Sequence, residues 1–225
     1  MRGVLVAGGT GALGAGVLRA LLDGGYPVTT TWLVERERDR VEQEFGDRVA
    51  LVEADLMEQA GADAAVEATP DIGAVVNLVG GFSAGPRAHE IEIETYEKML
   101  RLNLMPGFNL VRAAFPSMLS TGGTYVGVSA RPALQPFKGS AAYTTAKAAV
   151  LAFVKALDAD YAKDGIRSNA ILPSVIDTPA NRAATPDADF SKWVRPDDIG
   201  RVVRFLVSDD SAPTSGAAVP VYGKA

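Results

Sequence analysis

Short runs of β-branched and aliphatic residues alternate along the chain with longer segments of helical periodicity. The short runs predict seven strands, at residues 3–8, 27–34, 49–55, 74–80, 123–130, 166–175 and 217–223. The longer segments predict helices at 12–23, 35–45, 58–68, about 90–119, 141–163 and 197–208. Strict alternation of strand and helix is typical of βαβ units, whose strands pair in parallel. We therefore expect an α/β fold, a Rossmann-type doubly wound parallel sheet of about seven strands with helices on both faces.

The length and composition fit a single domain. A chain of 225 residues with 48% hydrophobic and 22% charged residues can bury a sizeable core. We see neither an internal repeat nor a linker, so residues 1–225 are expected to form one domain. The segment 177–196, rich in Pro, Ala and Asp, predicts a long loop or a short helical excursion. Loops of that length are usually functional, which makes it a candidate substrate loop or lid.

Charge and composition exclude several classes of function. The net charge is −5 and there is no Lys/Arg-rich run, so nucleic acid is not an expected partner. No apolar stretch reaches the roughly 18–20 residues of a membrane helix. The first strand begins at once, which leaves no room for a signal peptide and predicts a cytoplasmic protein. Without cysteine and with one histidine, His89, no Cys-ligated or multi-His metal site is expected.

Three glycines lie between the first predicted strand and the first predicted helix: Gly8, Gly11 and Gly14. Glycine permits a tight turn and lets backbone N–H groups approach a pyrophosphate at a helix N-terminus. Following a strand and opening an amphipathic helix, this pattern predicts a dinucleotide site.

The end of the second strand bears on which dinucleotide is bound. The residues there read "TTTWLVERER", with Thr31 and Trp32 where an acid would bind an NAD ribose. Arg36 or Arg38 could meet a 2′-phosphate instead, which favours NADP over NAD. Most of these charges are nevertheless expected on a solvated helix face, in pairs such as Arg38–Glu42.

From these landmarks the chain resembles the short-chain dehydrogenase/reductase family along nearly its whole length. The glycine turn is similar to the family's Thr-Gly-x-x-x-Gly-x-Gly, with Ala7 and Ala12 as departures, and Ser174 replaces a glycine of its Pro-Gly segment. Tyr143 and Lys147 match its Tyr-x-x-x-Lys pair. The resemblance implies cofactor contacts by Gly8, Thr10, Gly11, Leu13, Gly14, Asp55, Leu56, Asn77, Val79, Gly80, Tyr143, Lys147, Pro173, Ile176 and Thr178.

The same resemblance implies a reaction. Tyr143 would be the acid–base for a small carbonyl or alcohol as hydride moves to or from nicotinamide. A phenol titrates near pH 10, and the Lys147 ammonium, on the same helix face, would lower that pKa and hold the ribose. Asn103 would hold a water of the proton relay. The family also implies a homodimer or homotetramer packed through the helices at about 90–119 and 141–163.

The substrate-orienting serine of the family does not fall where it is expected. Its usual place, 13 residues before Tyr143, holds Ala130, and Ser129 lies one residue earlier. Adjacent side chains of a strand point to opposite faces, so the shift matters. Three interpretations remain open: Ser129 reaches the substrate through a local insertion, Ala130 occupies the site, or Ser140 substitutes. Ser140 also lies where the N-cap of the 141–163 helix belongs.

Alternatives follow from that open question. An alanine at the site is found in the dihydropteridine reductase branch of the family, whose glycine turn is also similar. A protein that binds NAD(P) without chemistry, as a sensor or scaffold, is a second alternative. A sugar-nucleotide epimerase is a weaker one, because the chain is short for the extra domain of those enzymes. Phe82 and Trp193 flank the expected pocket, where they line it or simply pack.

Overall fold

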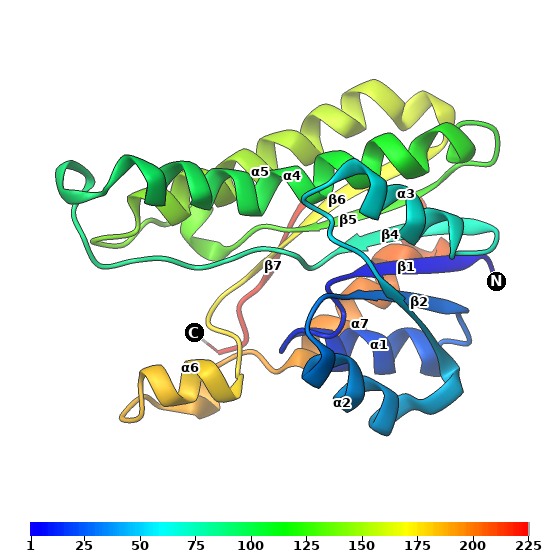
Figure 1. Ribbon diagram of the computed structural model, residues 1–225. Coiled ribbons are helices and arrows are strands. Elements are labelled where there is room, and N and C mark those ends of the chain that lie inside the picture. Colours follow the sequence, from blue (N-terminus) through cyan, green and yellow to red (C-terminus); the bar gives the residue numbers. More distant parts are fainter. Residues whose placement is uncertain (225) are drawn as a thin grey trace.

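One seven-stranded sheet organises the molecule (Figure 1). The computed structural model describes residues 1–224. All strand pairs are parallel, in the order β3-β2-β1-β4-β5-β6-β7. The strands are β1 (Gly3–Ala7), β2 (Val28–Trp32), β3 (Val49–Glu53), β4 (Ile72–Asn77), β5 (Gly123–Val128), β6 (Ile166–Pro173) and β7 (Ala218–Val221). The order reverses between β1 and β4, the place where open α/β sheets bind ligands.

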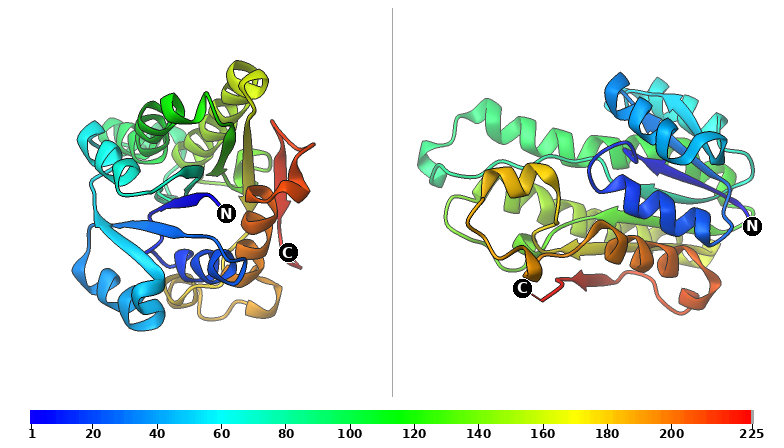
Figure 2. Two further views of the ribbon diagram at one scale, coloured as in Figure 1. Left: turned by 90° about the vertical axis from the view of Figure 1, so that its right-hand side faces the viewer. Right: turned by 90° about the horizontal axis from the view of Figure 1, so that it is seen from below.

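Helices cover both faces of this sheet (Figure 2). One face carries α1 (Gly14–Asp23), α2 (Glu35–Phe45) and α7 (Pro196–Val207). The other face carries α3 (Gln59–Glu67), α4 (Ile93–Met118) and α5 (Ala141–Tyr161). A short helix, α6 (Pro179–Ala184), lies within the connection from β6 to α7. The predicted Rossmann-type, doubly wound fold is therefore confirmed.

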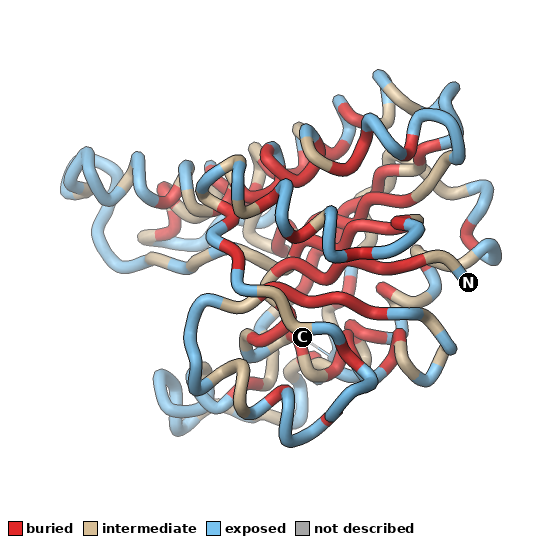
Figure 3. Tube along the Cα trace, turned by 45° about the vertical axis from the view of Figure 1, so that its right-hand side comes forward, coloured by how far each residue is buried: buried red, intermediate tan, exposed pale blue. Residues whose placement is uncertain are grey.

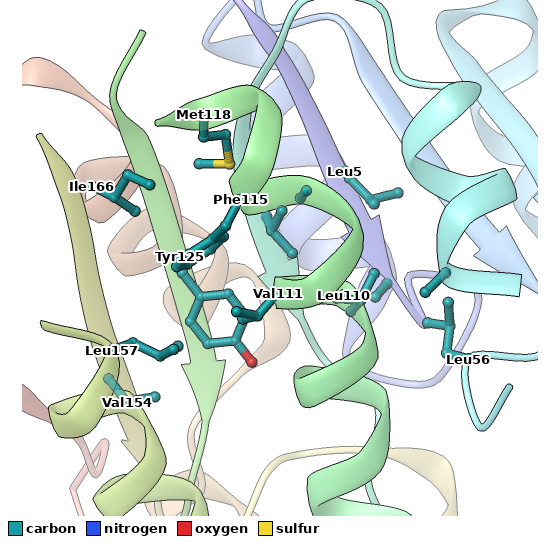
Figure 4. Packing of buried hydrophobic residues seen from close by; sticks show 14 of the residues in the cluster. Leu5, Leu56, Leu110, Val111, Phe115, Met118, Tyr125, Val154, Leu157 and Ile166 are labelled. Atoms are coloured by element: carbon teal, nitrogen blue, oxygen red, sulfur yellow. The ribbon is translucent and has the colours of Figure 1, made fainter. Parts of the chain in front are cut away.

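The core consists of two layers separated by the strands. Along β1, Leu5 and Ala7 face the α3–α5 side, whereas Val4 and Val6 face the α1–α7 side. Each of the four is at most 1% exposed. A strand buried on both faces reads as a continuous apolar run, which is why "GVLVA" does not alternate. Figure 3 shows these buried strands at the centre of the molecule, and Figure 4 shows how α4 and α5 pack over the sheet.

The predicted elements are all present, but several strands end earlier than the apolar pattern. The fourth ends at Asn77 and not at residue 80, and the fifth ends at Val128 and not at residue 130. Residues 78–80 and 129–130 therefore lie beyond the carboxyl ends of their strands, where the candidate site is located. The segment 177–196 takes the second of its expected forms, since α6 and a 3₁₀ turn (Phe190–Lys192) lie within it.

Two observations bear on the excluded classes. Within residues 1–224, no helix is long and apolar enough to cross a membrane. The same residues contain no group of three or more His, Asp or Glu side chains placed to hold a metal ion.

Candidate active site

The turn from β1 to α1 is built on close backbone approaches. Gly8 has φ +73°, and a Cβ added to it would lie 2.9 Å from the Val79 side chain. A Cβ on Gly14 would lie 1.8 Å from the Gly9 carbonyl oxygen. The Thr31 hydroxyl accepts a hydrogen bond from the Gly8 N–H at 3.0 Å, which fixes the turn to the end of β2. Only glycine fits at these places, and the cradle that results suits a pyrophosphate.

An open pocket extends from this turn across the carboxyl ends of β1 to β4. It contains several of the expected cofactor residues together with the end of β2. Its lining is Gly8, Thr10, Gly11, Thr31, Trp32, Leu33, Val34, Glu37, Ala54, Asp55, Leu56, Met57, Leu78, Val79, Gly80, Leu102 and Pro106. The lining joins the glycine turn to the Asp55-Leu56 and 77–80 elements, so the sequence landmarks converge on one cavity.

Two arginines lie at the edge of this pocket. Arg38 is stacked on Trp32, with its guanidinium carbon 4.8 Å from the ring centroid, and it also bonds Asp39 at 2.6 and 2.9 Å. Arg40 donates to the carbonyl oxygen of Thr10 in the glycine turn. Sequence reasoning missed Arg40, because nothing in the spacing of an exposed α2 residue signals that it reaches a turn 30 positions earlier.

The strand-end residues are held by hydrogen bonds within the protein. The Asn77 side-chain oxygen accepts from the Val79 N–H at 3.1 Å, and Asp55 accepts from the Met57 N–H at 2.9 Å. Asn109 of α4 donates to the Leu56 carbonyl at 3.1 Å. These bonds fix the backbone that lines the pocket, while Leu13 and Gly14 lie at the start of α1, outside the pocket lining.

Tyr143 and Lys147 lie one turn apart on α5, as their spacing predicts. The Lys147 ammonium is 5.9 Å from the Tyr143 ring centroid and donates to the Val128 carbonyl at 3.0 Å. Burial lowers the pKa of Lys147 to about 8 and raises the pKa of Tyr143 to about 12. Both shifts disfavour the charged form of each group, so at neutral pH the phenol keeps its proton.

Asn103 of α4 contacts the loop after β4. Its side-chain oxygen accepts from the Gly81 N–H at 3.2 Å, and its amide donates to the Gly81 carbonyl at 3.3 Å. A Cβ on Gly80 would lie 2.6 Å from the Asn103 oxygen and 2.9 Å from Lys147 Nζ. The structure therefore brings Asn103, Lys147 and the 80–81 backbone together.

Ser129 and Ala130 follow the end of β5 and are both buried. The Ser129 hydroxyl donates to the backbone carbonyl of Lys147 at 2.7 Å, and the residue is 1% exposed. Ala130 is 5% exposed and extended. The hydroxyl of Ser129 is thus committed to helix α5 and ties the helix to the end of the strand.

Ser140 occupies the N-cap position of α5 but does not cap the helix. Its hydroxyl donates to the Phe137 carbonyl at 2.6 Å and lies 2.9 Å from the Thr144 hydroxyl. Ser140 therefore stands at the expected N-cap position, but its side chain accepts no hydrogen bond from a backbone N–H of α5. The reason is that the preceding turn supplies closer partners.

Pro173 is the last residue of β6, and the segment that follows it begins at Ser174. The Ser174 hydroxyl donates to the Tyr222 carbonyl at 2.7 Å. Ile176 forms a parallel bridge with Val194, and the Thr178 hydroxyl accepts from the Asn181 N–H at 3.2 Å, capping α6.

An arginine and two partly buried aromatic rings stack on one another within this loop. Arg182 pairs with Asp177 at 2.5 and 2.8 Å and stacks on Phe190, which in turn packs on Trp193. Trp193 is therefore part of this internal packing.

Comparison with known proteins gives one consistent result. Residues 8–223 match a family model described as enoyl-(acyl carrier protein) reductase. The chain is 31% identical over 199 residues to 2-(R)-hydroxypropyl-CoM dehydrogenase of Xanthobacter autotrophicus, covering 80% of this chain and 78% of that protein. It is 30% identical over 236 residues to acetoacetyl-CoA reductase of Rhizobium meliloti, covering 99% and 97%.

Solved structures agree with these relatives. The 3-ketoacyl-(acyl-carrier-protein) reductase of Brucella melitensis, solved in complex with NADH, has a TM-score of 0.87 at 25% identity, covering 98% of this chain and 96% of that one. ElxO, solved with NADP bound, has a TM-score of 0.90 at 20% identity, covering 99% and 98%, which shows a shared fold.

Proposed function

Because the chain belongs to the short-chain dehydrogenase/reductase family, we propose that Tyr143 and Lys147 form the reactive centre of an NAD(P)-dependent oxidoreductase acting on a carbonyl/alcohol pair. A dehydrogenase or reductase of this family takes its hydride chemistry from the nicotinamide cofactor. The residues present fit that cofactor, since Gly8 and Gly14 leave no space for a side chain and the turn opens into the pocket at Gly8 and Gly11. The observation that carries the proposal is the pairing of Tyr143 with a buried Lys147, whose ammonium lies beside Gly80 of the pocket lining.

The proton chemistry favours reduction at neutral pH. With its pKa raised to about 12 by burial, Tyr143 is protonated and can donate to the oxygen of a bound carbonyl. The Lys147 ammonium then stabilises the phenolate that this donation leaves. Because the pKa of Lys147 is lowered to about 8, its charge is present below that pH and is lost above it. We expect carbonyl reduction to stay constant through neutral pH and to decline as pH rises past 8.

Ala130 occupies the place of the family's serine in this proposal. The Ser129 hydroxyl is committed to the Lys147 carbonyl, which supports the alanine reading over one in which Ser129 reaches the substrate. The same observation favours a second candidate function, a dihydropteridine-reductase-like enzyme that works without the serine. Turnover of a quinonoid dihydropterin, with simple ketones left unreduced, would select that candidate.

For the cofactor we propose a preference for NADP(H). Trp32 stands at the end of β2 where an acid would bind the NAD ribose, and Arg38 is held against its ring at the rim of the pocket. Glu37 also lines the pocket, and its charge opposes a 2′-phosphate. Changing Glu37 to Gln is therefore expected to increase the ratio of NADPH to NADH affinity, measured by fluorescence titration.

The oligomeric and cellular expectations remain predictions of the proposed function. Phe108 of α4 is 45% exposed and packs on Phe153 of α5. In a homodimer or homotetramer packed through α4 and α5, the partner subunit would cover this exposed ring. Light scattering at micromolar concentration tests the assembly, and a monomer would remove it. A cytoplasmic location also stays a prediction.

A Tyr143→Phe variant tests the central proposal. We expect at least about a thousandfold loss of kcat for carbonyl reduction, with the dissociation constant of NADPH unchanged, because only the proton donor is removed. Tyr161→Phe, at the far end of α5, is the matched control and should keep full activity. Full activity in Tyr143→Phe, or no turnover of any carbonyl or pterin by a wild type that binds cofactor, would contradict the assignment. The second outcome would favour a sensor.

A further inference from the structure

Phe82 is the aromatic side chain that packs directly on Tyr143. The two ring centroids are 4.9 Å apart and the ring planes make an angle of 72°, an edge-to-face contact. Phe82 is nevertheless 67% exposed. An aromatic ring left in water forgoes the free energy of burial, so its exposure beside the reactive phenol calls for an explanation.

The loop that carries Phe82 is fixed at two points. On one side, both backbone groups of Gly81 bond the Asn103 side chain, whose amide also donates to the Met99 carbonyl at 2.8 Å. On the other side, the Gly85 N–H donates to the Gly139 carbonyl at 3.0 Å. Gly139 has φ +80°, and a Cβ there would lie 2.6 Å from the Gly85 oxygen, so this approach requires glycine. The backbone on either side of Phe82 is therefore fixed, at Gly81 and at Gly85.

Other apolar side chains are exposed on the neighbouring loops. Leu134 and Phe137, which follow β5, are 55% and 46% exposed, and Val175, which follows β6, is 46% exposed. The carboxyl ends of β4, β5 and β6 meet at one edge of the parallel sheet, at the left of Figure 1. Three consecutive loops therefore carry exposed apolar side chains at the end of the sheet where α5 begins, two residues before Tyr143.

The polar side of the centre is correspondingly reduced. Ala130, which is 5% exposed, stands at the sequence position where the family has its serine, and the nearby Ser129 hydroxyl bonds the Lys147 carbonyl. A substrate in such a site obtains a hydrogen bond to its reacting oxygen from Tyr143 and must be oriented chiefly by apolar contact.

We propose that Phe82 is a specificity-determining residue that selects substrates with a flat apolar group, such as an aryl ring, next to the reacting carbonyl or carbinol carbon. The inference rests on the proposed function and names its substrate class. The flat group packs against the Phe82 ring while the reacting oxygen reaches the Tyr143 hydroxyl. Contact with Phe82 replaces the orientation that the missing hydroxyl would give.

The test compares an aryl methyl ketone with a short aliphatic methyl ketone, using NADPH and NADH in excess. Phe82→Ala should lower kcat/KM for the aryl ketone by about tenfold or more, while kcat/KM for the aliphatic ketone changes by less than about threefold. Cofactor affinity should not change. Phe205→Ala is the matched control, because Phe205 is likewise an exposed phenylalanine, at 46%, but lies near the carboxyl end of α7, away from the reactive centre. An equal effect of Phe82→Ala on both ketones, or none on either, would overturn the inference and leave the proposed function standing.

A binding measurement decides the inference even if neither ketone is reduced. In that case the affinity of the cofactor-loaded protein for the aryl ketone is measured by calorimetry, and the proposed function is judged separately, by turnover of the wider set of carbonyls and pterins. A loss of about tenfold in Phe82→Ala but not in Phe205→Ala supports the inference. Equal affinity in the three proteins, or no binding to wild type, overturns it.

Discussion

The two halves of the site are built on different principles. Around β1 to β3, the geometry depends on backbone approaching backbone, as where the Gly14 Cα lies against the Gly9 carbonyl. Around the ends of β4 to β6, it depends on which side chain faces which way, as with Ser129 and Ala130. A backbone contact permits one residue type, whereas a side-chain position permits many. The glycines of the cofactor half are consequently recognisable from their spacing, whereas the choice between Ser129 and Ala130 in the reactive half requires the structure.

The largest expected effect tests the backbone side of this comparison. Gly14→Ala places a Cβ 1.8 Å from the Gly9 oxygen, so the turn must move. We expect a loss of about 3 kcal/mol in the free energy of unfolding and weakened cofactor binding. Urea denaturation and fluorescence titration measure both. The control is Gly11→Ala, where the nearest atom would be 3.3 Å away and stability should change by less than about 1 kcal/mol. Wild-type stability in Gly14→Ala would remove the distinction between the halves.

The next effect concerns the buried Lys147 ammonium of the reactive half, which lowers the free energy of unfolding. The pKa of Lys147 is lowered from 10.5 to about 8, so below pH 8 the folded protein carries a buried charge that the unfolded chain solvates freely. Lys147→Met removes this buried charge but also loses the hydrogen bond to the Val128 carbonyl, which costs about 1 kcal/mol. The net effect at pH 7 should be a stabilisation of the cofactor-free protein by about 2 kcal/mol. Activity should be lost.

The pH dependence of that gain provides its control. Between pH 8 and 10.5 the unfolded chain binds more protons at this position than the folded protein, so wild-type stability rises with pH. The advantage of Lys147→Met should shrink over the same range, as followed by thermal unfolding. A variant less stable than wild type at pH 7 would show that Lys147 stabilises the fold.

The smallest effect tests which of Ser129 and Ala130 occupies the substrate-orienting position. Ala130→Ser restores the hydroxyl of the family pattern and should raise kcat/KM for a simple aliphatic ketone by up to about tenfold. Ser129→Ala, the paired variant, should lower the free energy of unfolding by about 1 kcal/mol through loss of the bond to the Lys147 carbonyl. If Ser129→Ala instead abolished ketone turnover with unchanged stability, Ser129 would be the substrate-orienting group.

Sequence was sufficient for the fold because burial on both faces of a parallel sheet leaves continuous apolar runs such as "GVLVA". It also placed the glycine turn and the Tyr143–Lys147 pair, whose spacing alone puts them on one helix face. It could not decide between Ser129 and Ala130, because a strand that ends at Val128 releases both residues from strict alternation. Nor could it find Arg40 on the Thr10 carbonyl, a contact between elements that no local pattern encodes.

The bridge between Ile176 and Val194 has a consequence for how this protein can change over generations. The Asp177 N–H donates to the Val194 carbonyl at 2.8 Å, and the Val194 N–H donates to the Val175 carbonyl at 3.0 Å. The intervening chain leaves and rejoins the body of the protein at one place. Residues of this loop can be substituted, inserted or deleted while β6 and α7 keep their positions. Sequence changes between Asp177 and Val194 can therefore accumulate while the strands of the sheet keep their register.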